Sequence, residues 1–253
     1  MNKSYIYQKI IENNMSHQTL ATRNQLLSVL PPDVKDRWMD ALELVEMPLG
    51  KVIYESGSKP SYVYFPETCI VSMLFVLESG ATAEIAVVGF EGMVGISVFM
   101  GGESTPSRAL IQSAGTAYRL PASFIKKEFN NSPPVIHLLL RFTQALITQM
   151  TQTAVCNRHH TLDQQLCRWM LLSLDRLTGA DLVMTQELIA NMLGVRREGV
   201  TEAAGKLQRD GLISYTRGRI HVVDRAGLQR RSCECYGVVK KEYERLLPDT
   251  VAQ

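Results

Sequence analysis

The sequence predicts an α+β protein in three consecutive parts: an N-terminal antiparallel β jelly roll, one long helix, and a C-terminal helical domain that ends in a β-hairpin. Three observations predict this class. Turn residues recur at short intervals between positions 44 and 120, separated by runs rich in Val, Ile, Tyr and Phe. Positions 135–158 contain no Gly and no Pro, directly after Pro133-Pro134, which can open a helix. Positions 184–213 read as two short helices around a glycine.

Length and composition fit this arrangement. A chain of 253 residues has room for two domains, each with its own core. Hydrophobic residues make up 45% and charged residues 21%, as in an ordinary globular protein. We place the parts at residues 1–24 (a polar N-terminal extension), 25–132 (the roll), 133–160 (the long helix) and 161–253 (the C-terminal domain).

The N-terminal half reads as one helix followed by short strands. The helix is expected between Leu26 and Leu42, entered after Pro31-Pro32. Strands are expected at residues 62–65, 70–76 and 83–88. Evenly spaced short strands are typical of an antiparallel barrel or jelly roll.

The long helix after Pro133 is apolar on two faces, and such a helix must bury both. Leu139, Phe142 and Leu146 form one face, which can cover the roll. The other apolar line consists of Ile136, Leu140, Ile147, Met150 and Ala154. We assign this second line to the same helix of a second subunit, which makes the chain a homodimer; burial of both faces within one chain is the alternative.

Residues 184–213 carry the pattern of a helix-turn-helix. Thr185 can cap a short helix, and Gly194 supplies a turn at which a positive φ costs little. The first helix has apolar positions at Leu188, Ile189, Met192 and Leu193. The second opens on Arg196, Arg197 and Glu198 and is expected to bury Val200, Ala203, Ala204 and Leu207. Side chains in its first turn can reach base edges in a major groove.

The neighbours of this motif predict a winged helix. Strand-like runs at 212–215 and 219–223 flank Thr216-Arg217-Gly218, which is typical of a tight hairpin turn. Upstream, Thr161 can cap a supporting helix. The domain is therefore interpreted as a winged helix-turn-helix that binds double-stranded DNA. The candidate DNA-binding residues are Thr185, Arg196, Arg197, Glu198, Thr201, Glu202, Lys206 and Arg217.

The charge distribution agrees with this interpretation. Residues 1–157 carry 12 Lys and Arg against 13 Asp and Glu, whereas residues 158–253 carry 15 against 12. The basic excess lies in the half with the helix-turn-helix, as contact with phosphates requires. It is small, and charge alone is weak evidence.

The order of jelly roll, long helix and winged helix, together with the GVRREGV stretch at 194–200, resembles the Crp/Fnr family of bacterial transcription regulators. Residues 26–247 carry the resemblance. It implies a homodimer that reads a palindromic operator through Arg197 and Glu198, with RNA polymerase as a further partner. A guanidinium can donate twice to guanine, and a carboxylate can accept from cytosine. Residues 25–132 then correspond to a cyclic-nucleotide-binding-like effector domain.

The effector domain departs from the cyclic-nucleotide binders of that family. Their Gly-Glu-Leu element reads Gly92-Met93-Val94 here, and their Arg-Ser or Arg-Thr element reads Arg108-Ala109. Met93 cannot accept a hydrogen bond from a ribose hydroxyl, which argues against cyclic AMP. The candidate effector pocket therefore consists of Gly92, Met93 and Arg108, and its small-molecule effector is not identified.

Other cofactors are not expected. No cysteine precedes Cys69, which argues against the N-terminal iron–sulfur cluster of the family's oxygen sensors. The sequence does not exclude haem binding, because a single histidine can ligate haem. The candidate ligands are His17, His137, His159 and His160. We expect these to be surface or capping residues, with His159-His160 marking a hinge.

The five cysteines are odd in number and scattered, which favours reduced thiols in the cytoplasm. Cys233 and Cys235 lie in a segment, 228–247, that reads as one helix. Residues two apart on a helix point away from each other, so we expect packing rather than a shared metal or a disulfide, and no metal site.

The sequence does not predict an enzyme. It has no Walker loop, nucleophile elbow or zinc-protease helix, and no apolar run of membrane-spanning length. The alternative to a DNA-binding regulator is a sensor or scaffold of the same architecture with weak or no DNA reading. Glu202 favours that alternative, because the family often has a basic residue at this place.

Overall fold

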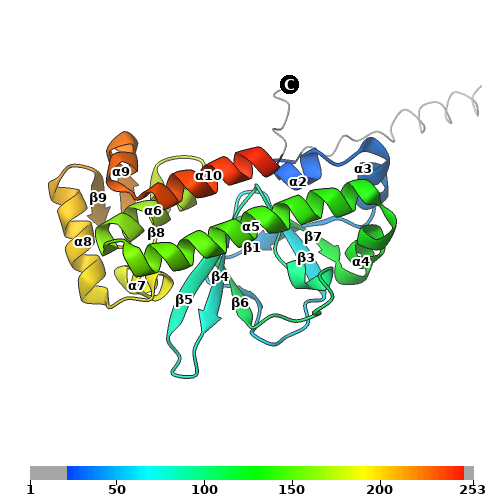
Figure 1. The fold of residues 1–253 in the computed structure, drawn as a ribbon, viewed down its shortest axis with the longest axis horizontal. Helices are drawn as coiled ribbons and strands as arrows, with labels where there is room; N and C mark the ends of the chain where they lie inside the picture. The colour runs from blue at the N-terminus through cyan, green and yellow to red at the C-terminus, as the bar shows by residue number, and fades with distance from the viewer. Residues whose placement is uncertain (1–21, 248–253) are drawn as a thin grey trace, which may run out of the picture.

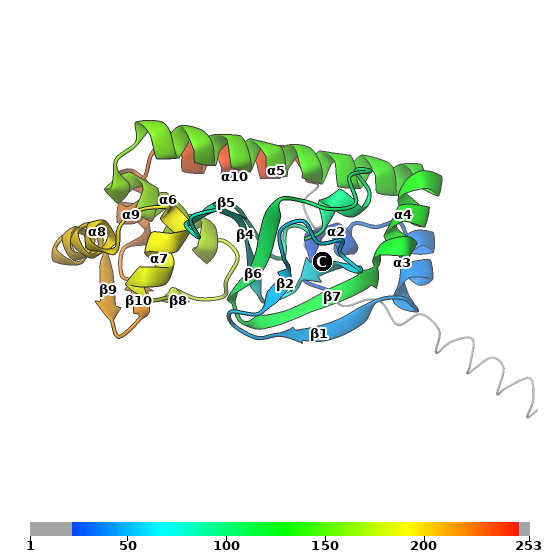
Figure 2. The same ribbon diagram turned by 90° about the horizontal axis from the view of Figure 1, so that it is seen from below.

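The computed structural model describes residues 22–247, and these residues are arranged along one long helix (Figure 1). A β-roll lies under one end of this helix and a smaller mixed domain under the other (Figure 2). The predicted extension 1–24, apart from residues 22–24, lies outside the described residues, and so does His17. The α+β class and its order of roll, long helix and helix-turn-helix are confirmed.

Two short helices precede the roll where the sequence predicted one. These are α2 (Gln25–Ser28) and α3 (Pro32–Met39). The side chain of Asn24 caps α2 by accepting from two backbone N–H groups. Pro31 has no N–H to continue α2, and Pro32 opens α3 at a position where that N–H is not needed. The single helix expected between Leu26 and Leu42 was therefore wrong.

The roll consists of two antiparallel sheets with strand orders β1-β7-β3 and β2-β6-β4-β5. Its strands are β1 (Glu43–Met47), β2 (Val52–Tyr54), β3 (Tyr62–Pro66), β4 (Ile70–Val76), β5 (Thr82–Val88), β6 (Ser107–Ser113) and β7 (Gly115–Pro121). Val63 and Phe65 alternate with half-buried tyrosines on β3 and are fully buried between the sheets. The short helix η1 (Ile96–Val98) and the helix α4 (Ala122–Asn131) close one end of the roll.

The long helix α5 (Pro133–His159) covers the roll with the face that the sequence assigned to it. Leu139, Phe142 and Leu146 are at most 1% exposed. Gly92 lies directly against Phe142: a Cβ at position 92 would be 2.2 Å from the Phe142 ring. Only glycine at position 92 therefore allows the helix to pack at this distance. Burying a side chain of this size stabilises a fold by about 1.5–3 kcal/mol.

The C-terminal domain begins with α6 (Leu162–Leu174), which opens in a capping box between Thr161 and Gln164. It continues with β8 (Asp181–Val183), α7 (Gln186–Leu193), α8 (Arg197–Arg209), β9 (Ile213–Thr216), β10 (Arg219–Val222), α9 (Arg225–Arg231) and α10 (Glu234–Leu246). The sequence did not predict β8, because three residues are too few for an alternating pattern. The last helix, α10, runs back beside α5 toward the roll (Figure 1).

Polar contacts fix the roll to the rest of the chain. Arg176, which follows α6, donates to Glu91 of the roll at 2.7 Å, and both side chains are buried. Gln149 of α5 accepts from the backbone N–H of Val87 at 2.8 Å and donates to the hydroxyl of Tyr243 at 2.9 Å. One continuous hydrophobic core runs through all three parts. None of the helices described is long and apolar enough to span a membrane.

Candidate nucleic-acid interface

The turn between α7 and α8 has the geometry that the sequence predicted. The Thr185 hydroxyl caps α7 by accepting from the backbone N–H of Leu188. Gly194 ends α7 with φ +66°, in the left-handed region that favours glycine. A Cβ at Gly194 would lie 3.3 Å from the Cβ of Ala83, so the turn also packs against β5 of the roll.

Helix α8 buries one side and exposes the other. The buried side chains are the four that the sequence predicted: Val200, Ala203, Ala204 and Leu207. Arg196 is the N-cap, and Arg197 and Glu198 follow it in the exposed first turn. At helical spacing, Arg197, Thr201 and Gln208 share one exposed side, and Glu198, Glu202 and Lys206 the neighbouring one.

The hairpin between β9 and β10 forms the wing. Arg217 and Gly218 both have positive φ, +49° and +76°, as a two-residue type I′ turn requires. The turn leaves Arg217 exposed at the tip. The Tyr215 hydroxyl donates to the carbonyl of Met184 at 2.8 Å, and the Tyr215 N–H donates to the Gln208 side chain at 2.9 Å. The second bond holds the wing beside α8, and the first joins it to the segment that precedes α7.

The wing and α8 enclose a concavity of about 470 Å³. Four of the predicted DNA-binding residues line it: Thr185, Arg197, Thr201 and Arg217. Gln186, Gln208 and Tyr215 line it too, and sequence reasoning missed them. Gln208 could have been found from its helical spacing to Arg197, whereas Tyr215 is brought there by the hairpin. We call this concavity together with the exposed first turn of α8 the recognition surface.

The charged side chains of α8 and the wing tip are unevenly paired. Within residues 22–247, no carboxylate oxygen lies within 4 Å of the guanidinium groups of Arg196, Arg197 or Arg217. Lys206, in contrast, lies 3.0 Å from Glu202 one turn earlier, and this hydrogen bond raises the pKa of Lys206. Glu198 is exposed beside Arg197. The start of α8 thus presents arginines without a carboxylate partner among the described residues, whereas in its middle Lys206 and Glu202 neutralise each other.

The candidate effector residues do not form one pocket. Met93 is fully buried, and Gly92 lies against Phe142. Arg108 lies on β6, where its Nε donates to Glu55 at 2.7 Å near the surface of the roll. The Met93 side chain therefore belongs to the core under α5, and the guanidinium of Arg108 is held by a carboxylate of its own chain.

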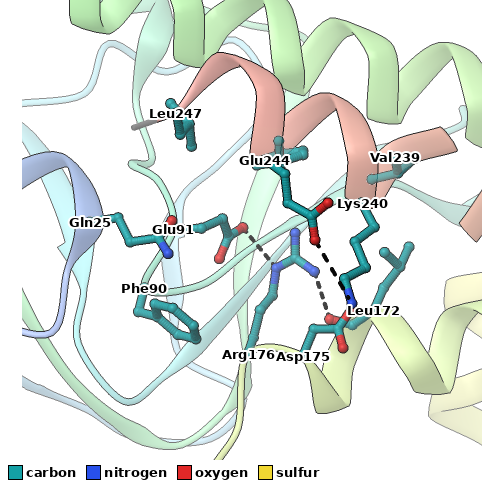
Figure 3. A pocket seen from close by; sticks show the side chains of 11 residues that line it. Gln25, Phe90, Glu91, Leu172, Asp175, Arg176, Val239, Lys240, Glu244 and Leu247 are labelled. Carbon is teal, nitrogen blue, oxygen red and sulfur yellow. Dashed lines mark hydrogen bonds and ion pairs between the residues drawn. The ribbon is translucent and has the colours of Figure 1, made fainter. Parts of the chain in front are cut away.

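A different cavity, of about 260 Å³, lies where the roll, α6 and α10 meet (Figure 3). Its wall includes the buried Arg176–Glu91 pair, and Lys240 and Glu244 of α10 lie 3.9 Å apart at its edge. Sequence reasoning did not find this cavity, because its residues come from four separate segments. Its polar groups serve mainly to join the roll to the C-terminal domain.

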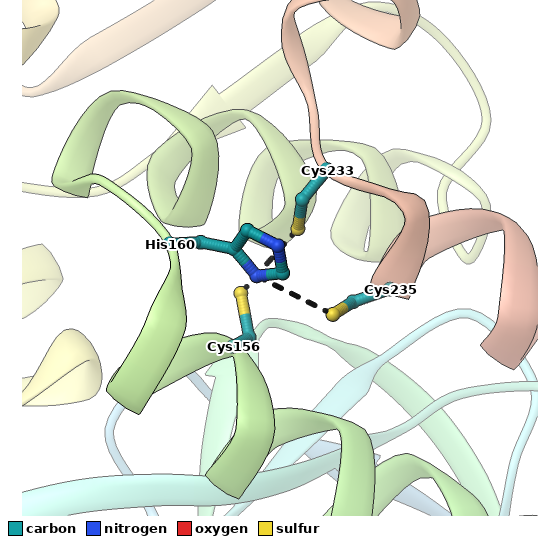
Figure 4. Close-up of side chains that lie close together, drawn as sticks. All are labelled: Cys156, His160, Cys233 and Cys235. Carbon is teal, nitrogen blue, oxygen red and sulfur yellow. Dashed lines mark hydrogen bonds between the residues drawn. The ribbon is translucent and has the colours of Figure 1, made fainter.

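The prediction of one helix over residues 228–247 was wrong, and so was the expectation that Cys233 and Cys235 point away from each other. Residues 228–247 are not one helix, because α9 ends at Arg231 and Cys233 is the N-cap of α10 with ψ 168°. In this extended conformation, the thiols of Cys233 and Cys235 both turn toward the end of α5 (Figure 4). His160, expected at a hinge, lies beside them, whereas His137 and His159 are exposed on α5.

Known proteins share this architecture. Residues 164–231 match the Crp-like helix-turn-helix domain. The global nitrogen regulator of Synechococcus elongatus is 22% identical over 200 residues, which cover 75% of this chain and 90% of the relative. The resemblance to Crp/Fnr regulators is confirmed, and the matched relative is a regulator rather than an enzyme.

Two solved structures show the same fold. FixK2 from Bradyrhizobium japonicum superposes with a TM-score of 0.64 at 18% identity, over 76% of this chain and 98% of that one. A CRP/FNR-family transcriptional regulator from Thermus thermophilus gives a TM-score of 0.61 at 22% identity, over 75% of this chain and 98% of that one.

Proposed function

Because this chain carries a Crp-like helix-turn-helix domain on the fold of the Crp/Fnr regulators, we propose that it is a transcription regulator that binds a palindromic operator as a homodimer. The observation that carries the proposal is the recognition surface, where Arg197, Thr201 and Arg217 converge around one concavity. Arginines that have no carboxylate partner within residues 22–247, placed on the exposed side of a second helix and its wing, suit a polyanion with grooves.

Arg197 and Glu198 are the proposed base-reading pair. Both lie in the first turn of α8, the part of a recognition helix that enters the major groove. Arg197 can donate two hydrogen bonds to O6 and N7 of guanine, and Glu198 can accept one from N4 of cytosine. Arg217 at the wing tip is assigned to phosphate, because a single exposed cation on a turn provides charge without base selectivity.

The homodimer is proposed to form along α5. Leu140, Ile147 and Ala154 are seven residues apart and exposed, with Leu140 and Ile147 at 48% and 52%. A seven-residue repeat of exposed apolar side chains is the pattern of a two-helix coiled coil. Met150, predicted for the same line, packs partly against the core of its own chain, and Ile136 is half-buried. The centre of the interface is therefore Ile147.

Cyclic AMP is not the proposed signal. The position of a ribose-binding acceptor holds the buried Met93, and Nε of Arg108 already donates to Glu55, whose negative charge disfavours a phosphate beside it. We propose that the roll mainly supports α5 and the dimer.

In vitro selection from a random DNA library, with the full-length protein at a stated salt concentration, tests the proposed function. The expected result is an enriched palindrome whose half-site centres lie about one helical turn (~10 bp) apart or a multiple of it, each with a fixed G·C pair. Fluorescence anisotropy on the selected site should then give at least about 1,000-fold tighter binding than on scrambled DNA. Failure to enrich any sequence would favour the sensor or scaffold alternative.

A further inference from the structure

Four metal-ligating side chains converge where α5 ends and α10 begins (Figure 4). Cys156 and His160 lie one turn apart at the end of α5, and Cys233 and Cys235 flank the first residue of α10. One ligand atom from each lies within 4.8 Å of all the others. The three cysteines also form a buried cluster separate from the main hydrophobic core, which contains the thiol of Cys167.

We propose that Cys156, His160, Cys233 and Cys235 bind one Zn²⁺ ion in a closed tetrahedral site. Zinc bonds of about 2.3 Å to sulfur and 2.0 Å to nitrogen, at tetrahedral angles, place two sulfurs roughly 3.8 Å apart and a sulfur and a nitrogen roughly 3.5 Å apart. The Sγ atoms of Cys156 and Cys233 are 3.5 Å apart. The Sγ of Cys235 lies 3.6 Å from Nδ1 of His160. Both distances match edges of that tetrahedron.

The surroundings of His160 support a metal ligand. Its Nδ1 faces the thiols, and its Nε2 lies 3.3 Å from a carboxylate oxygen of Glu234. A histidine that binds metal through one ring nitrogen usually donates the N–H of the other to a carboxylate or carbonyl, which fixes the tautomer. In the proposed site, Glu234 would orient His160 in this way, with Nδ1 directed at the metal.

Burial and charge agree with a closed structural site. Cys156, Cys233 and Cys235 are at most 5% exposed, and the His160 side chain is 14% exposed. Three thiolates, one imidazole and Zn²⁺ carry a net charge of −1. The nearby Arg168 is buried, donates to Thr153 one turn before Cys156, and has no carboxylate oxygen within 4 Å among residues 22–247. This guanidinium supplies the balancing charge.

A disulfide between Cys156 and Cys233 explains less of the geometry. Such a bond needs sulfurs at about 2.05 Å, and it uses two of the four side chains. It accounts neither for the third thiol nor for the imidazole aimed at the same point. Four ligands from two helices, with none in excess, are the donor set of structural zinc.

The position of the site gives it a consequence for DNA binding, and this part of the inference rests on the proposed function. The ion would tie α10 of the DNA-binding domain to the end of the dimer helix, at the link between α5 and α6. Zinc would thereby fix the angle at which the two recognition surfaces of a dimer are held.

Metal analysis of the full-length protein, purified with reductant and without chelator, tests the site. We expect about one zinc per chain in the wild type and in the controls Cys69→Ala and Cys167→Ala, which remove buried thiols outside the cluster. Cys233→Ser and Cys235→Ser should retain less than about a fifth of that. Cobalt-loaded wild type should show the visible bands of tetrahedral Co²⁺ and a thiolate charge-transfer band, both absent from the serine variants.

A second variant tests the site without removing a ligand. Glu234→Gln should weaken zinc binding about 10- to 100-fold with an unchanged circular dichroism spectrum. Glu244→Gln, further along the same helix, is the matched control and should not change it. Removing zinc from the wild type with a chelator should lower Tm by at least about 5 °C, and added Zn²⁺ should restore it.

The outcomes separate the site from its coupling to DNA. A wild type that holds no zinc and forms no tetrahedral cobalt complex overturns the site, as does a Cys156–Cys233 disulfide in protein kept under reductant. If the protein binds zinc but its affinity for DNA does not change when the zinc is removed, the coupling alone is overturned. A protein that binds zinc but no specific DNA overturns the proposed function and leaves the site standing.

Discussion

The β-roll and the recognition surface differ in whether their cationic side chains are paired with carboxylates. In the roll, Arg108 lies 2.7 Å from Glu55, and Arg119 lies 2.7 Å from Glu43. Hydrogen bonds from Lys126 and Lys59 lower the pKa of Glu103 to about 2. At the recognition surface, no such partner lies within 4 Å of Arg196, Arg197 or Arg217 among residues 22–247.

This difference shows which charges are available to another molecule. Exposed ion pairs stabilise a protein by only about 0–1 kcal/mol, but a paired cation must give up its carboxylate before it can bind an external anion. Cations without a partner have no such cost. The arginines of the recognition surface can therefore bind an external anion without that cost, whereas Arg108 of the roll already shares its charge with Glu55.

The largest expected effect is the loss of base reading in Arg197→Ala. Binding to the selected operator should weaken by about 1–3 kcal/mol per half-site, and the preference for the G·C pair should relax. Arg217→Ala is the companion variant. It should weaken binding to all DNA sequences alike and reduce the slope of log K against log salt by about 1 per half-site.

Fluorescence anisotropy on the operator and on a version altered at that pair measures both effects. Arg245→Ala, an exposed arginine on α10 remote from the recognition surface, should bind like the wild type. If Arg197→Ala discriminates the two DNAs as well as the wild type does, the assignment of Arg197 is incorrect.

The next effect concerns the dimer that presents two recognition surfaces. Ile147→Asp should raise the dimer dissociation constant at least about 100-fold, because two unpaired carboxylates would be buried in the α5 interface. Leu44→Asp on β1, a residue of similar exposure (55%), is the control and should leave the dimer intact. Sedimentation equilibrium gives the constants, and a monomeric wild type at micromolar concentration contradicts the interface.

Glu84 makes the stability of the roll depend on pH, because it is a buried carboxylate with no cation within 4 Å among residues 22–247. Burial raises the pKa of Glu84 to about 7 from its usual 4.5, against the hydrogen bond from Ser72. The folded state then holds a proton that the unfolded state loses. The loss of folding stability caused by burying Glu84 is therefore absent below pH 4.5, grows between pH 4.5 and 7, and stays constant above pH 7.

The free energy of unfolding should therefore fall by roughly 2 kcal/mol between pH 5 and 7.5 through this group. Urea unfolding at the two pH values measures it. Glu84→Gln should remove that part of the slope, whereas Glu78→Gln on the exposed hairpin should not. Equal slopes in wild type and Glu84→Gln would mean that Glu84 is ionised in the folded state.

The smallest expected effect is that of cyclic nucleotides, which should be nil. With Met93 buried and Arg108 paired, cyclic AMP and cyclic GMP should give no saturable heat at micromolar concentration and no change in DNA affinity. Isothermal titration calorimetry measures the heat. Saturable binding that Arg108→Ala abolishes would show that the guanidinium leaves Glu55 for a ligand.

Local chemistry made much of the recognition surface predictable. The cap at Thr185, the positive φ of Gly194 and the buried side of α8 depend on residues no more than four positions apart. The same holds for the burial of Leu139, Phe142 and Leu146 on α5. Periodicity failed where a segment was too short, as in β8, or where one residue broke it, as Pro31 did before α3.

The sequence by itself therefore determined the long helix α5, the turn of the helix-turn-helix and the apolar faces of α5 and α8, because these follow from interactions between near neighbours in the chain. Tertiary structure alone decided the pairing of Arg176 with Glu91, 85 residues apart, and of Arg108 with Glu55. It also brought Cys156 within 3.5 Å of Cys233, 77 residues later. Such contacts depend on how finished elements dock, and no local pattern records that docking.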